Sequence, residues 1–170
     1  MSDTTSSQVP GLYRRKIGDV TVTAISDGYI DAPFAAVLGI EEADADAILR
    51  ESFRRSPPRI NVNCYLIQSG GRTALVDTGS GDTMGPTLGH LFANLKACGV
   101  AEADVDTILL THMHPDHSNG LSAADGSKLF PNAEIVVSET DVEFWHDDGA
   151  RSRAPESQQT RYFDGARDRA

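Results

Sequence analysis

Residues 111–120 read Thr-His-Met-His-Pro-Asp-His-Ser-Asn-Gly, the segment of the chain with the highest density of potential metal ligands. It places three of the chain's five histidines and one aspartate within six positions, as His112, His114, Asp116 and His117. The apolar residues 107–110, Thr-Ile-Leu-Leu, come directly before it and are typical of a buried strand. Neutral imidazole and carboxylate oxygen are ligands that zinc and related divalent ions prefer. The four side chains are therefore predicted metal ligands.

The spacing of these residues predicts two metal ions. Alternate side chains of an extended chain point the same way, so His112 and His114 present two imidazoles to one side. Pro115 disfavours helix at the residue before it, and after the turn Asp116 and His117 supply two more donors. Four donors exceed what one catalytic ion needs if a position stays open for water. We expect one ion on each pair, about 3.5–4 Å apart, with a polar surface loop as the alternative.

The pattern His-X-His-X-Asp-His over residues 112–117 resembles the signature of the metallo-β-lactamase superfamily. Residues 75–79, Leu-Val-Asp-Thr-Gly, are similar to the Asp-X-Gly turn that ends a core strand in that family, and residues 61–67 resemble the strand before it. His114 occupies the position where the di-iron, oxygen-reducing branch has glutamate. The resemblance therefore implies hydrolytic zinc chemistry rather than redox iron chemistry.

Three further segments are similar to one branch of that superfamily, which holds methyl parathion hydrolases and some acyl-homoserine lactone lactonases. They are residues 17–28, 130–133 and 141–145. The resemblance implies a hydrolase in which water activated by two zinc ions attacks an ester, a lactone or a phosphotriester; other divalent metals are an alternative. Asp116 is then both a metal ligand and the catalytic residue that takes or returns a proton.

Asp77 lies at the end of an apolar strand, before Thr78 and Gly79. One interpretation is an ordinary turn aspartate that caps the amides that follow it. The resemblance favours a second interpretation, in which the Asp77 carboxylate orients the metal-binding histidines or their loop without binding the ions itself.

The resemblance also implies ligands after His117: a third histidine for the first ion, a bridging aspartate, and a last histidine for the second ion. After His117 the chain has only His146, which lies in an expected helix and receives no ligand role. We therefore expect the N-terminal half of a longer enzyme, or a chain completed by a homodimer or a complementing chain. The alternative is a truncated or degenerate half-domain with weak metal binding and no activity alone.

Composition limits the partners and the compartment. The net charge is −10 and the pI is about 4.8, which argues against nucleic acid because phosphate binding needs a basic surface. No apolar run approaches the roughly 18 residues that span a bilayer, so we expect no membrane partner. Cys64 and Cys98 are isolated and are expected to be free thiols of a reducing compartment. A small-molecule substrate and a cytoplasmic location are the expectations.

The order of the expected elements indicates an α+β fold. Strands are expected as two hairpins, residues 12–17 with 20–26 and 60–68 with 72–77, and at residues 106–111 and 133–138. Helices are expected over residues 41–55, 86–98 and 139–147. By resemblance this is half of a four-layer αββα sandwich, a mixed sheet with helices on its outer face. The expected division is a disordered N-terminus at 1–10, the domain at 11–148, and a flexible tail or truncated connection at 149–170.

Overall fold

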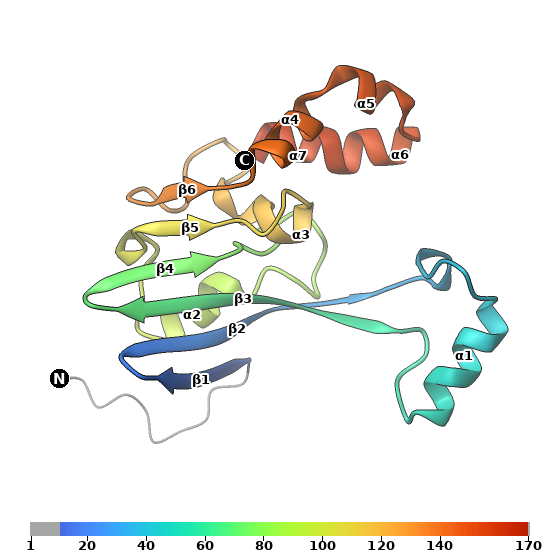
Figure 1. Cartoon of the computed structure of the whole chain (residues 1–170), viewed down its shortest axis with the longest axis horizontal. Coiled ribbons are helices and arrows are strands. Elements are labelled where there is room, and N and C mark those ends of the chain that lie inside the picture. Colours follow the sequence, from blue (N-terminus) through green and yellow to red (C-terminus); the bar gives the residue numbers. More distant parts are fainter. Residues whose placement is uncertain (1–10, 170) are drawn as a thin grey trace.

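A six-stranded mixed sheet forms the centre of the chain, with the strands in sequence order (Figure 1). The computed structural model describes residues 11–169, so the expected disordered segment at 1–10 lies outside the described residues. The strands are β1 (Leu12–Ile17), β2 (Val20–Asp31), β3 (Arg59–Ser69), β4 (Arg72–Val76), β5 (Thr107–Leu109) and β6 (Glu134–Val136). β1 to β4 pair antiparallel, whereas β5 pairs parallel with both β4 and β6. The expected mixed sheet and both expected hairpins are confirmed.

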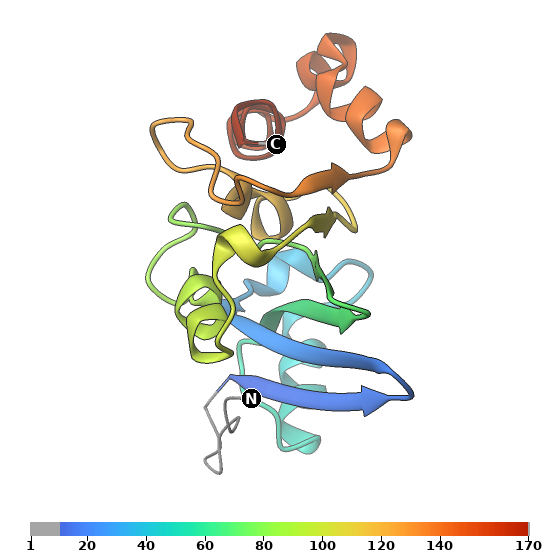
Figure 2. The same ribbon diagram turned by 90° about the vertical axis from the view of Figure 1, so that its left-hand side faces the viewer.

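Helices lie on one face of the sheet and beyond its ends (Figures 1 and 2). They are η1 (Phe34–Ala36), α1 (Glu42–Glu51), α2 (Leu91–Ala97), η2 (Glu102–Asp104), α3 (Pro115–Ser118), η3 (Asn119–Leu121), α4 (Glu139–His146), α5 (Asp148–Arg153), α6 (Glu156–Gln158), η4 (Gln159–Asp164) and α7 (Gly165–Arg169). β2 and β3 extend past the other strands and carry α1 at the end of an arm (Figure 1). Among the described residues, none of these helices is long and apolar enough to cross a membrane.

The two faces of the sheet differ in what covers them. Alternate residues of a strand point to opposite faces, and Cys64 and Leu66 of β3 are fully buried on the side of α2. Leu91 and Leu95 of α2 are fully buried in the same core. Tyr65, which alternates with the buried pair, is 43% exposed. Within residues 11–169 the sheet is therefore packed on one face and open on the other.

The helix expected over residues 86–98 begins at Leu91 instead, so the predicted start is wrong. Gly85 and Gly89 have φ values of 91° and 80°, which a right-handed helix does not allow. The buried Asp27 carboxylate accepts hydrogen bonds from the amides of Gly89 and Leu91 at 3.2 and 3.0 Å. These bonds hold residues 85–90 as a loop, and Gly99 closes the helix with a φ of 76°, as expected for a left-handed cap.

The segment expected as a flexible tail is folded into helices through Arg169. Phe163 and Ala166 are 3% and 0% exposed, and the ring of Phe163 lies 4.9 Å from that of Trp145. Arg167 Nε donates to the Trp145 carbonyl oxygen at 2.9 Å. The flexible-tail interpretation is therefore wrong for residues 149–169, because a few apolar side chains in a polar sequence pack against α4.

Candidate metal centre

The loop after β5 places the predicted ligands at the start of a short helix. Leu110, the residue after β5, remains bonded to the end of β6, because its amide donates to the Val136 carbonyl oxygen at 2.9 Å. His114 has extended backbone angles of −70° and 152°, and Pro115 opens α3 immediately after it. Proline suits this first helical position because its missing N–H has no helical partner there. Two imidazoles therefore leave an extended segment, and Asp116 and His117 follow on the first turn of α3.

The three imidazole rings lie against one another. The ring centroids of His112 and His117 are 4.0 Å apart, and those of His112 and His114 are 4.6 Å apart. Asp116 Oδ2 lies 3.2 Å from His117 Nε2. The fold thus brings all four predicted ligands into one partly buried cluster, with the donor types that zinc prefers.

Asp77 supports this cluster from beneath. It is 5% exposed and has a φ of 59°, a left-handed conformation that aspartate tolerates better than most residues. Asp77 Oδ2 lies 2.8 Å from His117 Nδ1, while Oδ1 accepts from the Thr111 amide at 2.8 Å. The Thr111 hydroxyl lies within 3.0 Å of both Asp77 oxygens and 3.1 Å from His112 Nδ1. The Asp77 carboxylate therefore contacts His117 directly and His112 through the Thr111 hydroxyl.

The turn after Asp77 is locked to α3. The amide and hydroxyl of Thr78 both reach the His117 carbonyl oxygen, at 2.7 and 3.0 Å. Gly120 packs so closely that an added Cβ would lie 1.9 Å from the Thr78 carbonyl oxygen. The end of β4 and the metal-binding loop are thus one rigid unit.

A carboxylate and two aromatic rings on the C-terminal helices complete the surroundings, and sequence reasoning assigned none of them a role. The Met113 amide donates to Asp141 Oδ2 at 2.6 Å, and Trp145 Nε1 donates to Asp141 Oδ1 at 3.1 Å. The rings of Trp145 and Tyr162 lie 5.4 and 5.0 Å from that of His114. The spacing of Asp141 and Trp145 places them on one helix face, but does not identify the loop that they meet.

The electrostatics of the cluster suit a cation. Burial, and then the charge of a neighbouring histidine, lower the pKa values of His112 and His114, so both stay neutral and able to bind metal. Burial alone would lower the pKa of His117, but hydrogen bonds to Asp116 and Asp77 outweigh it and raise that pKa to about 9. Burial opposes ionisation of Asp116, yet its bond to His117 lowers its pKa. Two carboxylates around His117 thus favour positive charge.

The number of donors falls short of a complete site. Among residues 11–169, no three His, Cys, Asp or Glu side chains form a group that could hold one ion. The cluster offers four side chains of the donor types that zinc prefers. His146 adds none, because it is exposed and its Nδ1 lies 2.9 Å from the carbonyl oxygen of Val142 in its own helix. Cys64 and Cys98 are free thiols outside the cluster.

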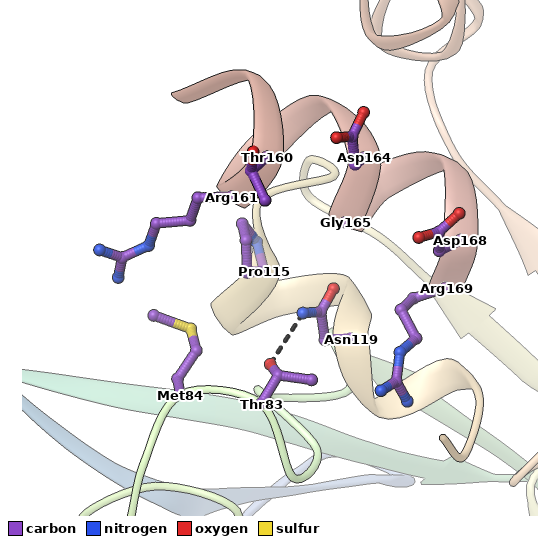
Figure 3. A pocket seen from close by; sticks show the side chains of 10 residues that line it. All are labelled: Thr83, Met84, Pro115, Asn119, Thr160, Arg161, Asp164, Gly165, Asp168 and Arg169. Carbon is purple, nitrogen blue, oxygen red and sulfur yellow. Dashed lines mark hydrogen bonds between the residues drawn. The ribbon is translucent and has the colours of Figure 1, made fainter. Parts of the chain in front are cut away.

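Two hollows border the cluster without including its four ligands. One, of about 670 Å³, lies between α3, the loop at Thr83 and Met84, and the helices η4 and α7 (Figure 3). In it Asn119 Nδ2 donates to Thr83 Oγ1 at 2.8 Å. The other, of about 370 Å³, is lined mainly by apolar groups that include Trp145 and Tyr162. This second hollow thus adjoins the two rings that contact His114.

Comparison with known proteins gives consistent matches. Residues 57–169 match the family model of the metallo-beta-lactamase superfamily. The crystal structure of the hydrolase AbOPH, described as in the beta-lactamase superfamily, is 34% identical with a TM-score of 0.84, over 95% of this chain and 56% of that one. AidC, described as a dizinc quorum-quenching lactonase in complex with a product, is 26% identical with a TM-score of 0.82, over 92% and 56%.

Curated relatives match over shorter stretches. Beta-lactamase-like protein 2 homolog of Drosophila melanogaster is 43% identical over 67 residues, which are 39% of this chain and 22% of that protein. Atrochrysone carboxyl ACP thioesterase of Passalora fulva is 39% identical over 72 residues, or 42% and 20%. The chain thus spans about half of the solved structures and about a fifth of the curated proteins. The chain belongs to the metallo-β-lactamase superfamily.

Proposed function

We propose that this chain carries part of the active site of a zinc-dependent hydrolase that acts on an ester or a lactone. One observation carries the proposal: three imidazoles and the Asp116 carboxylate form one cluster above the buried Asp77. The identity of zinc is supported by AidC, which is described as a dizinc enzyme. His112 and His114 would hold one ion, and Asp116 and His117 the other. Bound zinc supplies a water of near-neutral pKa and polarises the group under attack.

The chain's own residues prepare the donors and move the proton. A hydrogen bond from His117 Nδ1–H to the Asp77 carboxylate would leave Nε2 to bind a metal, which would displace the other ring proton. Burial keeps His112 and His114 neutral near pH 7. The lowered pKa of Asp116 keeps its carboxylate ionised and able to bind a metal. One of its oxygens would also take a proton and return it to the leaving group.

The substrate class is proposed from the relatives and from the apolar hollow. AidC is described as a lactonase and the Passalora fulva protein as a thioesterase, and both names denote hydrolysis at an acyl carbon. The 370 Å³ hollow beside Trp145 and Tyr162 offers an apolar wall for an acyl chain. Phosphotriesters are the second substrate class that we propose to test.

The short donor count favours one alternative, a half-domain that binds metal weakly and is inactive alone. In the active protein we propose that the remaining donors come from a longer polypeptide, a second copy or a complementing chain. Metal content separates these possibilities. Close to two zinc ions per chain requires donors from elsewhere, whereas substoichiometric zinc without turnover supports the inactive half-domain.

The experiment compares His114→Ala with His146→Ala, whose ring is exposed and outside the cluster. Zinc content is measured by elemental analysis, and turnover on a panel of esters, lactones, thioesters and phosphotriesters. We expect His114→Ala to lose zinc and any turnover, and His146→Ala to match the unmodified chain. Equal zinc content in all three proteins would contradict the proposed ligands.

A further inference from the structure

We propose that Asp141 is a positioning residue that sets the direction of the His112 and His114 imidazoles. This inference rests on the proposed function, because it concerns two of the proposed zinc ligands. Asp141 belongs to α4, and its carboxylate bridges two groups that flank His114: the Met113 amide and the Trp145 indole.

The first contact fixes the backbone between the two ligands. Asp141 Oδ2 accepts from the Met113 amide at 2.6 Å, a bond that spans 28 residues of sequence. Met113 is 3% exposed, so its side chain anchors the same point in the core. Since His112 and His114 are its immediate neighbours, a shift of this amide turns both imidazoles. A charged acceptor makes such a bond shorter and stronger than a neutral one.

The second contact fixes the ring beside His114. Asp141 Oδ1 accepts from Trp145 Nε1 at 3.1 Å, and Trp145 is 8% exposed. The Trp145 ring meets the His114 ring at 62° with the centroids 5.4 Å apart, and Tyr162 also lies against His114. The indole cannot rotate without breaking its bond to Asp141. One carboxylate therefore restrains His114 through its backbone and through its ring.

The helix itself does not account for this arrangement. Asp141 is the third residue of α4 after the N-cap Ser138, where an acidic side chain ordinarily reaches back to the N-cap amide. Among the bonds of the described residues, Asp141 makes no such capping contact and gives one oxygen to the metal-binding loop and the other to Trp145. The two aspartates thus contact different parts of the cluster. Asp77 contacts His117 directly and His112 through Thr111, whereas Asp141 contacts the Met113 amide and Trp145.

The expected effect follows from the number of acceptors that each variant keeps. Residues that orient metal ligands typically change metal affinity by about 10–100-fold when mutated. Asp141→Asn keeps one acceptor oxygen, so we expect zinc affinity to fall about 10-fold; Asp141→Ala keeps none, so we expect about 100-fold. Trp145→Phe removes the indole N–H together with part of the ring, so it should weaken zinc affinity more in the unmodified chain than in Asp141→Ala, where the bond to Nε1 is already lost.

The control is Asp106→Asn. Asp106 Oδ2 also accepts from a backbone amide, that of Thr73 at 2.7 Å, but it lies at the end of β5 away from the metal loop. Two measurements are made on each full-length variant: histidine-ring and Met113 amide NMR signals without zinc, and the zinc Kd by competition with a chelator. We expect both to change in Asp141→Asn and neither to change in Asp106→Asn.

Each outcome decides the inference. Unchanged His112 and His114 ring signals in Asp141→Asn would overturn the positioning role of Asp141, and this measurement needs no zinc. If the unmodified chain bound no zinc, that separate result would refute the proposed function. Changed ring signals with an unchanged zinc Kd would also overturn the positioning role of Asp141. If Asp141→Ala does not fold, the Asn and Trp145→Phe variants carry the test, with folding checked by urea unfolding.

Discussion

Replacing Asp77 by asparagine tests the support of the metal centre most sharply. Asparagine has the same shape, but one carboxylate oxygen becomes an NH2 group that can only donate. If the carbonyl oxygen still accepts from the Thr111 amide, the NH2 group faces His117 Nδ1, which then has to be an acceptor. The remaining ring proton moves to Nε2, the nitrogen proposed to bind zinc. The substitution thus favours the His117 tautomer that carries its proton on Nε2 and cannot bind zinc through that nitrogen.

The magnitude follows from the bonds lost. The Asp77–His117 bond, at 2.8 Å, is charge-assisted and buried at the carboxylate, and such bonds contribute about 1.5–3 kcal/mol. We expect Asp77→Asn to lower the free energy of unfolding without zinc by about that amount and to weaken zinc binding about 10–100-fold. Urea denaturation measures the first quantity and chelator competition the second.

Thr111→Val is the matched comparison. It removes the hydroxyl bonds to Asp77 and His112 but leaves the Asp77–His117 contact in place. We expect its zinc affinity to fall less than that of Asp77→Asn. If Asp77→Asn binds zinc as tightly as the unmodified chain, the orienting role of Asp77 is refuted.

Two further predictions concern packing. Gly120→Ala should destabilise the chain by about 1–3 kcal/mol through overpacking, because its Cβ would collide with the Thr78 carbonyl oxygen at 1.9 Å. Gly165→Ala should stabilise the chain by about 0.5–1 kcal/mol, because an added Cβ in α7 would make only ordinary van der Waals contacts. Urea midpoints equal to that of the unmodified chain would contradict both expectations. Phe163→Ala should cost about 3–5 kcal/mol, because the ring is 3% exposed. Phe53→Ala, at 99% exposed, should change stability by less than about 0.5 kcal/mol, and the same small effect at Phe163 would show that the last helices do not pack.

Local sequence patterns predicted the elements that depend on neighbouring residues. Alternating apolar residues gave both hairpins, and the position of Pro115 between the ligands predicted that the chain turns after His114. The supporting role of Asp77 stays a prediction, and its carboxylate lies 2.8 Å from His117 Nδ1. These features depend on the spacing of apolar residues, on proline and on turn-forming residues, all of which can be read within a short segment of sequence.

Contacts between distant segments could not be read in this way. The start of α2 depends on Asp27, which binds amides 62 and 64 residues away. Asp141 acts on a loop 28 residues earlier, and neither aspartate differs from a surface aspartate by sequence alone. The helices at 148–169 were missed because their polar composition hides the two apolar residues that are buried, Phe163 and Ala166.

X-ray absorption at the zinc edge of the zinc-loaded chain tests the central claim most directly. Imidazole and carboxylate ligands predict a first shell of nitrogen and oxygen at about 2.0–2.2 Å, with the multiple scattering of imidazole rings. His114→Ala should reduce the imidazole signal. A sulfur shell at about 2.3 Å would instead place zinc on Cys64 or Cys98, which lie outside the cluster, and would contradict the proposed metal centre.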